Sequence, residues 1–334
     1  MTVKKLLLKI IRKLGKIFEN ICKKNKLIKY DFIGNEHIKN FGNDFSDKTF
    51  YIIRRRPPGS GLLSNFHWVL NHTIYATSKG YIPVVNMGDY KTFYNEKKPL
   101  KLSSGNTSIN AWEYYFEQPC GYSLEDIKNA KNVILGDWDN YLIAEYPSPY
   151  GGSKNISEYY ELISKYCRFN PETVLACEKK KQLLFGNKKN ILGVLYRGTD
   201  YKIAKKHNTP ASLEQTIEKT RQVLQQEKFD YIFFCTEVHE AIDEFCKAFP
   251  QKKVFFSEYE RIKNYNNKDG DIPDIIQKSS SSAYQNGFEY ITDMILLSQC
   301  DGLIAPKVNG THFALGLNNN QYRYSYIFDF GFNS

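Results

Sequence analysis

The feature that most constrains the fold is a regular alternation of short apolar runs and helical patterns from residue 191 to residue 317. The run at 191–196 is mostly aliphatic and ends sharply at Arg197-Gly198-Thr199-Asp200, as expected of a buried strand that enters a turn. Strands that alternate with helices form parallel sheets with right-handed crossovers. The sequence therefore predicts a doubly wound α/β domain, with strands at 191–197, 231–235, 254–256 and 302–305 and helices near 213–227, 240–248, 288–299 and from 309 onward.

An earlier stretch has the same strand–helix–strand character. A strand at 49–53 is followed by the glycine loop Gly59-Ser60-Gly61, by a helix that ends near Lys79 and by a second strand at 81–85. Backbone N–H groups at the start of such a helix can face an anion, although the glycine spacing matches neither a P-loop nor the full dinucleotide fingerprint. At least one of the arginines at 54–56 is expected to face a phosphate or an acceptor.

These two patterns and the chain length together predict two domains. A chain of 334 residues is long for one core and suits two α/β domains. We expect a basic amphipathic helix and a polar linker at 1–48, an N-terminal acceptor-side domain at 49–187 and a C-terminal donor-binding domain at 188–334. Helical spacing at 156–187 places helices at the end of the first domain, and the aromatic segment at 110–116 is expected in its core.

The net charge of +10 is concentrated at the N-terminus. Residues 1–30 contain ten basic residues against Glu19 alone, whereas the remaining 36 basic and 35 acidic residues nearly cancel. A nucleic-acid groove needs a basic face on the folded body of a protein, so we expect no nucleic-acid partner. Apolar residues at steps of three and four along 3–24 predict an amphipathic helix with lysines on its other face.

Such a basic amphipathic helix favours attachment to an anionic membrane surface, at the inner face of the cytoplasmic membrane. The alternative for residues 3–24 is a helix that packs on its own domain or on a partner. The sequence contains no apolar run long enough to span a bilayer and no secretory signal. Seven cysteines without a CxxC pair indicate reduced, buried thiols, not a disulfide framework or a zinc site. We therefore expect a cytoplasmic, peripheral membrane protein.

Polar residues follow the strands of the second predicted sheet. Because the carboxyl ends of parallel strands share one edge, these residues are expected to converge on a crevice between the two domains. Arg197 would bind a diphosphate there, assisted by backbone N–H groups of the glycine loop and of the helix start at 309–311. Charge stabilisation of this kind suits a sugar nucleotide whose diphosphate leaves, and it needs no metal. The residues concerned are Arg197, Asp200, Thr236, Glu237, Asn309, Gly310 and Thr311.

Asp137-Trp138-Asp139 leaves a different interpretation open. It is a DxD motif that follows the apolar run at 133–135. Two carboxylates at this spacing are typical of the metal clamp of GT-A glycosyltransferases, which use manganese or magnesium. In that alternative the chain is a metal-dependent enzyme that uses Asp137 and Asp139.

Three segments of the chain resemble one glycosyltransferase superfamily. Residues 193–200, 233–237 and 292–304 look like the donor-binding half of α-1,6-fucosyltransferases, including the nodulation and core-chitobiose types, and of protein O-fucosyltransferases. The loop at 59–67 is similar to the glycine loop in the first domain of that family. The segment from Asp293 to residue 304 is the most specific part of the resemblance.

The resemblance implies a GT-B fold, with two Rossmann-like domains that face a central cleft. It also implies inverting transfer of fucose from GDP-fucose without a metal and without a further cofactor. Arg197 would bind the β-phosphate, and Asp293 would read the nucleotide base. The other donor-binding residues that the resemblance implies are Gly59, Gly61, Asn65, Thr236, Glu237, Asn309, Gly310 and Thr311.

The chain departs from the family pattern at two positions. Leu195 stands where family members often carry a histidine that contacts the base, and Gly198 stands where the core-type enzymes have a second arginine. No carboxylate matches the family's general base, so Asp200, His207 and Asp89 are all candidates. These departures leave open a second alternative, a non-catalytic protein that binds nucleotide sugars or glycans.

The sequence thus favours a fucosyltransferase in which Arg197 and Asp200 are catalytic. A composition rich in Lys, Asn and Ile is typical of AT-rich bacterial genomes, so the expected acceptor is a bacterial surface glycan or a lipid-linked oligosaccharide. Tethering through residues 3–24 would raise the local concentration of a lipid-linked acceptor.

Overall fold

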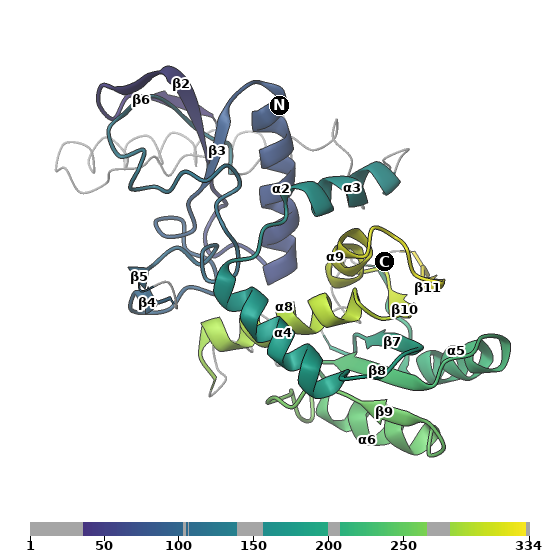
Figure 1. Ribbon diagram of the computed structural model, residues 1–334. Helices are drawn as coiled ribbons and strands as arrows, with labels where there is room; N and C mark the ends of the chain where they lie inside the picture. Colours follow the sequence, from purple (N-terminus) through teal and green to yellow (C-terminus); the bar gives the residue numbers. More distant parts are fainter. Residues whose placement is uncertain are drawn as a thin grey trace, which may run out of the picture.

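The computed structural model describes residues 36–102, 105, 107–138, 156–199, 208–265 and 281–331. These residues form two larger sheets flanked by helices, and a two-stranded sheet of β4 (Leu100–Lys101) and β5 (Thr107–Ser108) (Figure 1). The helix predicted at 3–24 lies outside the described residues. Among the described residues, none of the helices combines the length and the apolar composition that are needed to span a bilayer.

The first sheet has four strands in the order β1-β6-β2-β3. β2 pairs in parallel with both β3 and β6, whereas β1 pairs antiparallel with β6. α2 packs on one face, and apolar side chains of the loop before β6, among them Tyr122, Leu124 and Ile127, pack on the other. The bounds are β1 His37–Lys39, β2 Asp44–Ile53, α2 Leu62–Ser78, β3 Ile82–Val85 and β6 Ala130–Leu135.

The second sheet has five strands in the order β11-β10-β7-β8-β9, and all of them are parallel. β7 is central and buried at every residue, as expected of a strand with helices over both faces. α5 and α6 cover one face, while α8 and α9 cover the other. The bounds are β7 Ile191–Tyr196, α5 Leu213–Gln226, β8 Tyr231–Thr236, α6 His239–Ala248, β9 Lys253–Phe255, α8 Ala283–Leu297, β10 Gly302–Pro306, α9 Asn309–Leu317 and β11 Tyr324–Phe328.

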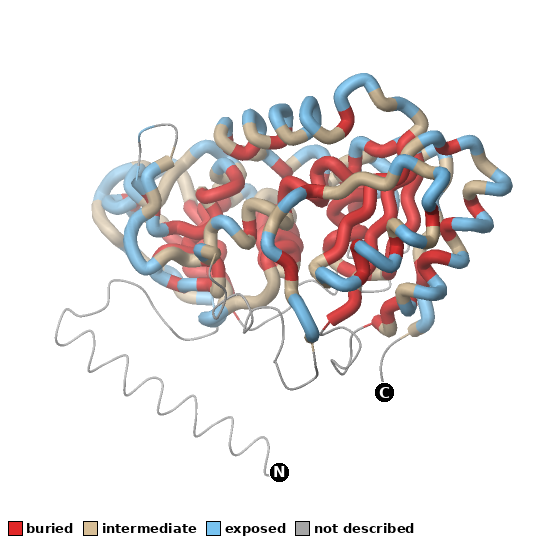
Figure 2. The backbone as a smooth tube through the Cα atoms, turned by 90° about the horizontal axis from the view of Figure 1, so that it is seen from below, coloured by how far each residue is buried: buried red, intermediate tan, exposed pale blue. Residues whose placement is uncertain are grey.

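In chain order, two helices lie between the strands of the first sheet and those of the second: α3 (Ile156–Tyr166) and α4 (Pro171–Leu184). Both pack on helices of the second sheet, which with its helices is the second half of the molecule; the first sheet and α2 are the first half. α3 contacts α9 and α4 contacts α8. α4 starts after Asn170, whose side chain accepts a hydrogen bond from the backbone N of Thr173 at 2.9 Å. α3 also contacts α2, so one apolar core extends from the first sheet to the second, as the buried segments in Figure 2 show.

The predicted domain ranges 1–48, 49–187 and 188–334 stay predictions. The strand β1 and the beginning of β2 lie within the stretch whose polar composition predicts a linker. Polar residues are accommodated there because most of the side chains from His37 to Lys48 are exposed or half-buried. α3 and α4 precede residue 188 in the chain but pack on helices that follow it.

Most elements of the second sheet lie where the sequence predicts them. β11 is an additional edge strand that the sequence pattern does not indicate. α8 begins at Ala283 instead of near 288, because Ser282 caps it by accepting a hydrogen bond from the backbone N of Gln285 at 3.1 Å.

The aromatic segment at 110–116 is core, as predicted, with Trp112, Tyr114, Tyr115 and Phe116 all buried. The cysteines within the described residues are free thiols. Four of them are buried as predicted, Cys246 is half-buried, and the prediction is wrong for Cys120, which is exposed. The buried four are Cys167, Cys177, Cys235 and Cys300.

Candidate functional site

Arg197 lies at the carboxyl edge of the second sheet, as the first residue after β7. Its side chain is 15% exposed, and its Nε atom lies 3.7 Å from Oε1 of Glu237. Glu237 follows β8, the neighbour of β7, and the register of this pair joins Tyr196 to Thr236 at the strand ends. Two groups that the sequence places after separate strands are therefore side by side. Asp200, the other predicted catalytic residue, lies outside the described residues.

Glu237 also binds the turn that follows Arg197. Its Oε1 accepts hydrogen bonds from the backbone N of Gly198 at 3.0 Å and from the hydroxyl of Thr199 at 2.7 Å. A Cβ atom at Gly198 would lie 2.8 Å from the side chain of Val238, so the turn has no room for a larger residue. Packing therefore requires the glycine that stands where the core-type fucosyltransferases have their second arginine.

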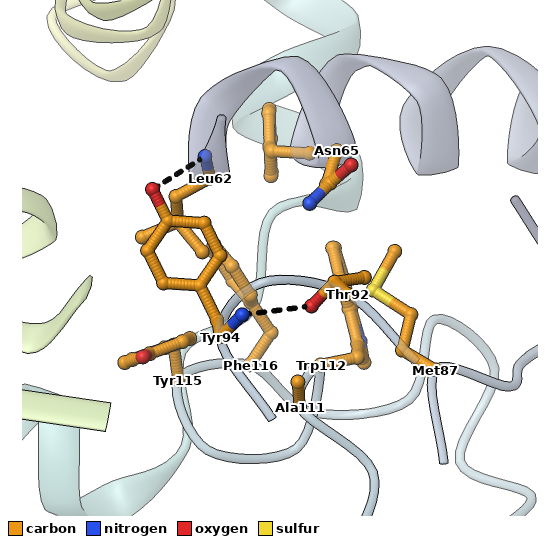
Figure 3. A pocket seen from close by; sticks show the side chains of 10 residues that line it. Leu62, Asn65, Met87, Thr92, Tyr94, Ala111, Trp112, Tyr115 and Phe116 are labelled. Atoms are coloured by element: carbon orange, nitrogen blue, oxygen red, sulfur yellow. Dashed lines mark hydrogen bonds between the residues drawn. The ribbon is translucent and has the colours of Figure 1, made fainter. Parts of the chain in front are cut away.

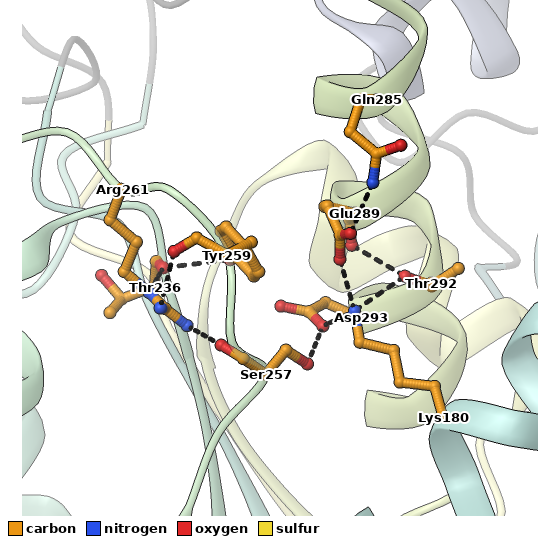
Figure 4. A network of polar contacts seen from close by, with 9 residues as sticks. All are labelled: Lys180, Thr236, Ser257, Tyr259, Arg261, Gln285, Glu289, Thr292 and Asp293. Carbon is orange, nitrogen blue, oxygen red and sulfur yellow. Dashed lines mark hydrogen bonds and ion pairs between the residues drawn. The ribbon is translucent and has the colours of Figure 1, made fainter. Parts of the chain in front are cut away.

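Thr236, the last residue of β8, is buried, and its polar groups are bound within the protein. Its hydroxyl accepts a hydrogen bond from the backbone N of Val238 at 3.1 Å. Its carbonyl accepts from the Tyr259 hydroxyl at 3.2 Å and from Nε of Arg261 at 3.0 Å. Nη2 of Arg261 donates in addition to the carbonyl of Ser257 at 2.6 Å (Figure 4). The segment after β9 thus fixes the end of β8.

Asp293, to which the family resemblance assigns base recognition, lies in an ion-pair network on α8 (Figure 4). It is 1% exposed, its Oδ1 lies 3.0 Å from Nζ of Lys180, and it accepts a hydrogen bond from the Ser257 hydroxyl. Lys180 comes from α4 and also lies 2.8 Å from Glu289 and 3.0 Å from the Thr292 hydroxyl. Burial by itself lowers the pKa of Lys180, but Asp293 and Glu289 raise it above its ordinary value. The carboxylate of Asp293 is therefore engaged by a charged lysine.

Asn65 holds the shape of the glycine loop in the first half. Its Oδ1 accepts hydrogen bonds from the backbone N of Ser60 at 3.1 Å and from Nη1 of Arg55 at 2.8 Å, and its Nδ2 donates to the Ser60 carbonyl at 2.9 Å. Gly59 has a φ of +74°, a conformation that glycine adopts without strain. At Gly61 no atom lies within 4 Å of a would-be Cβ, so this part of the loop borders open space.

The three arginines before the loop have different surroundings. Arg54 is fully buried. It donates hydrogen bonds from Nε to the carbonyl of Gly136 at 2.6 Å and from Nη1 to the Tyr90 hydroxyl at 3.2 Å. Arg55 is half-buried against the loop, and Arg56 is exposed. Arg54 therefore joins the ends of β2 and β6, while Arg55 and Arg56 are the two that reach the surface.

His67 joins the glycine-loop helix α2 to the start of α9. Its Nε2 donates to the carbonyl of Asn309 at 3.2 Å, and its Nδ1 accepts from the hydroxyl of Tyr159 in α3 at 2.5 Å. A carbonyl can only accept, so Nε2 carries a proton. Burial lowers the pKa of His67 to about 4, which agrees with a neutral ring.

The predicted turn Asn309-Gly310-Thr311 forms the first turn of α9, close after β10. β10 pairs with β7, so this turn and Arg197 lie at the same sheet edge. No side chain caps the helix, whose N-cap is Val308. A Cβ at Gly310 would lie 2.7 Å from the Tyr290 hydroxyl, so α9 approaches α8 closely here.

The structure thus brings together two groups of predicted site residues. In the first group, Gly59 and Gly61 precede α2 and Asn65 lies in its first turn. The next turn of α2 contacts the start of α9 through the hydrogen bond of His67 with the carbonyl of Asn309. Arg197, Thr236 and Glu237 lie at the sheet edge from which α9 also begins. Asp293 is linked to that edge through Ser257 and Arg261.

No protein-family model matches the chain, and no curated protein sequence matches it. Among solved structures, the apo form of POFUT1 aligns with a TM-score of 0.50 at 10% identity, over 85% of this chain and 99% of that chain. Fucosyltransferase NodZ from Bradyrhizobium aligns with a TM-score of 0.47 at 17% identity, over 80% of this chain and 92% of that chain. The chain has a fucosyltransferase-like GT-B fold.

This GT-B fold argues against the GT-A alternative. Asp137 follows β6 in the first sheet and is 9% exposed, and Asp139 lies outside the described residues. No group of three or more His, Cys, Asp or Glu side chains that could hold a metal ion occurs in the part of the chain that the structure describes.

The roles of His67, Lys180 and Arg261 are not evident from the sequence. His67 lies on the buried face of α2, where a histidine in an apolar pattern gives no sign of its partner. Lys180 lies between Lys179 and Lys181, and a run of three lysines looks like a solvated helix face. Which lysine turns inward depends on how α4 packs on α8, which local sequence does not encode.

A small apolar pocket lies beside the start of α2 (Figure 3). The hydroxyl of Tyr94 accepts a hydrogen bond from the backbone N of Leu62 at 3.1 Å, and the backbone N of Tyr94 donates to the Thr92 hydroxyl at 3.2 Å. The centre of a water molecule can occupy about 10 Å³ of this space, which is room for about one water. The pocket therefore supports the start of α2 and is too small for a sugar. It is lined by Leu62, Asn65, Phe66, Met87, Thr92, Tyr94, Ala111, Trp112, Tyr115 and Phe116.

Proposed function

We propose that the chain is an inverting, metal-independent glycosyltransferase that transfers fucose from GDP-fucose to a glycan. The observation that carries this proposal is the contact between His67 of α2, the helix that follows the glycine loop, and Asn309 at the start of α9, which begins at the sheet edge that bears Arg197. In this proposal both helix starts and the Arg197 guanidinium would face one diphosphate, since backbone N–H groups at helix starts and a planar guanidinium both suit phosphate oxygens. The GT-B fold and the resemblance of residues 193–200 and 292–304 to fucosyltransferases support the same donor.

In this proposal the protein lowers the barrier by stabilising charge on the departing GDP. Arg197 would contact the β-phosphate, and backbone N–H groups of the first turn of α9 would add hydrogen bonds. Fixed donors of this kind contribute strongly because they need no reorganisation during the reaction. Asp89 is the candidate base within the described residues: it is exposed, follows β3 and accepts a hydrogen bond from Asn86 at 2.9 Å. Asp200 and His207 remain the other candidates.

Release of nucleoside diphosphate from a panel of nucleotide sugars tests the donor and the metal requirement together. The panel contains GDP-fucose, GDP-mannose, UDP-glucose and UDP-N-acetylglucosamine, each with and without EDTA. The proposal predicts release of GDP from GDP-fucose that EDTA does not reduce. Arg221→Ala is a matched control, because Arg221 is on α5 with a side chain 51% exposed, and it should turn over like the wild type. Loss of activity in EDTA, or turnover of UDP sugars alone, would refute the proposal.

We further propose that the acceptor is a bacterial surface glycan or a lipid-linked oligosaccharide, and that the enzyme works as a peripheral protein on the inner face of the cytoplasmic membrane. The support is the basic amphipathic pattern of residues 3–24. Deleting residues 1–24 should abolish sedimentation with vesicles that contain an anionic phosphatidylglycerol fraction, and leave GDP release unchanged. Equal sedimentation of both forms would contradict the anchor.

A non-catalytic protein that binds nucleotide sugars is the second candidate. It is favoured by Leu195 at the family's histidine position and by the ion pair that engages Asp293. Tight binding of GDP-fucose without release of GDP, in the same panel and with acceptor glycans present, would support this candidate.

A further inference from the structure

One oxygen of Glu237 faces three N–H or O–H donors, two of them at hydrogen-bond distance and the third, Nε of Arg197, farther away. Oε1 accepts hydrogen bonds from the backbone N of Gly198 and the hydroxyl of Thr199, and it lies 3.7 Å from Nε of Arg197. All three donors belong to the turn after β7, whereas Glu237 itself follows β8. With its side chain 18% exposed, the carboxylate faces its own protein more than solvent.

The main chain at Glu237 is also fixed, by hydrogen bonds from the segment after β9. Its backbone carbonyl accepts a hydrogen bond from the backbone N of Ile262 at 2.9 Å. The residue before it, Thr236, has its carbonyl bound by Arg261 and Tyr259. Arg261 binds the carbonyl of Ser257, whose hydroxyl donates to the Lys180–Asp293 ion pair (Figure 4). A continuous chain of polar contacts therefore leads from α4 and α8 to the turn that carries Arg197.

We propose that Glu237 is a positioning residue for Arg197 and does not contact the nucleotide itself. This inference rests on the proposed function of Arg197 as the diphosphate ligand. Glu237 approaches Arg197 at Nε, the guanidinium nitrogen nearest the main chain. A carboxylate at this position fixes the plane of the guanidinium, and a planar fork binds a phosphate well only in one orientation.

The geometry also explains why the carboxylate is needed in addition to the turn. Gly198 and Thr199 would keep an acceptor if Glu237 were glutamine, because the amide oxygen can replace Oε1. Arg197 would lose the negative charge that lies 3.7 Å from its Nε atom, and with it the attraction that orients the guanidinium in this proposal. Glu237→Gln therefore separates the shape of the turn from the orientation of Arg197.

A double-mutant cycle tests this role, with Arg197→Ala, Glu237→Gln and the combined variant assayed for release of GDP from GDP-fucose. At metal sites, loss of a residue that supports a metal ligand typically costs about 10- to 100-fold, and we take this range for a residue that supports Arg197. We expect Glu237→Gln to lower kcat by about that factor, and we expect it to cost nothing further when Arg197 is already alanine. Glu244→Gln on α6, an exposed residue, is the matched control and should match the wild type. Equal losses from Glu237→Gln in both backgrounds would overturn the proposal.

A second measurement does not depend on turnover. The Nε–Hε signal of Arg197 in a ¹H–¹⁵N spectrum can be assigned by its disappearance in Arg197→Lys. We expect this signal to shift and to exchange faster with solvent in Glu237→Gln, and to stay in place in Glu244→Gln. An unchanged signal in Glu237→Gln would overturn the positioning role even in an active enzyme. If the wild type releases no GDP from GDP-fucose, the proposed function fails, and the spectrum still decides whether Glu237 orients Arg197.

Discussion

We predict that three buried histidines make the stability of the fold depend on pH in mild acid. His67, His72 and His312 are between 1% and 5% exposed. Burial lowers their pKa values to about 4, about 3 and about 3, respectively. Each ring has a tyrosine partner: Tyr159 for His67, Tyr51 for His72 and Tyr160 for His312.

The size of the acid effect follows from the unfolded state. Histidines in an unfolded chain have pKa values near 6.5, so they take up protons between pH 6.5 and pH 5 while these three rings in the folded protein do not. A depressed pKa contributes stability that is present above pH 6.5 and is lost as the pH falls toward the folded value. At pH 5 the loss is about 2 kcal/mol for each histidine, or about 6 kcal/mol in total, which is comparable to the whole stability of many domains.

Urea unfolding at pH 7.5 and at pH 5.0 measures this loss. The signal can be tryptophan fluorescence, because Trp68, Trp112 and Trp138 are buried in the folded protein. His72→Gln should reduce the difference between the two pH values by about 2 kcal/mol, since one titrating group is removed. His239→Gln is the matched control: His239 is exposed, and its removal should leave the difference unchanged.

A free energy of unfolding that is the same at both pH values would refute this reasoning. It would mean that the three rings are protonated in the folded protein at pH 5, and hence that they are not buried as the structure describes. A difference that persists in full in His72→Gln would exclude His72 as one of the responsible groups.

Three further predictions concern the buried ion pair, the packing of α8 and the glycine loop. Lys180→Met should destabilise the protein by about 3–5 kcal/mol in urea unfolding, because it leaves the buried carboxylate of Asp293 without its cation. Lys180→Met/Asp293→Asn should recover part of that loss, and a double variant that is no more stable than Lys180→Met would contradict the ion pair. Gly287→Ala should cost about 1–3 kcal/mol, because its Cβ would lie 2.2 Å from the Tyr115 hydroxyl. Gly61→Ala, which meets no atom within 4 Å, should keep the melting temperature and raise the KM for the donor; loss of stability in Gly61→Ala would contradict the open loop.

Features that depend on local sequence could be predicted. The apolar run at 191–196 and the abrupt turn after it place Arg197 at the end of a strand, and the structure has β7 at Ile191–Tyr196. Short apolar runs that end in polar turns also predict β8 and β10, and the turn after β10 predicts the start of α9. Parallel pairing then places the residues after these strands at one edge, since sheet topology restricts where strand ends lie.

Contacts between distant helices could not be predicted in this way. His67 and Asn309 are 242 residues apart in the chain, and their hydrogen bond depends on how α2 docks against α9. The role of Asp293 has the same difficulty. The family resemblance implies a carboxylate that reads the base, but Lys180 of α4, which lies in a run of three lysines, packs against it. The predicted roles of Asp200, His207 and residues 3–24 stay predictions, since these residues lie outside the described ranges.

The most direct test of the central proposal compares GDP release from GDP-fucose by the wild type and by Arg197→Ala at saturating donor. Removing one fixed donor to a developing negative charge costs about 100- to 1,000-fold in kcat at comparable sites. We predict a loss of that size in Arg197→Ala, with the fold retained because Arg197 lies at a sheet edge, outside the apolar core. Turnover by Arg197→Ala at the wild-type rate would contradict the proposal that Arg197 stabilises the departing diphosphate.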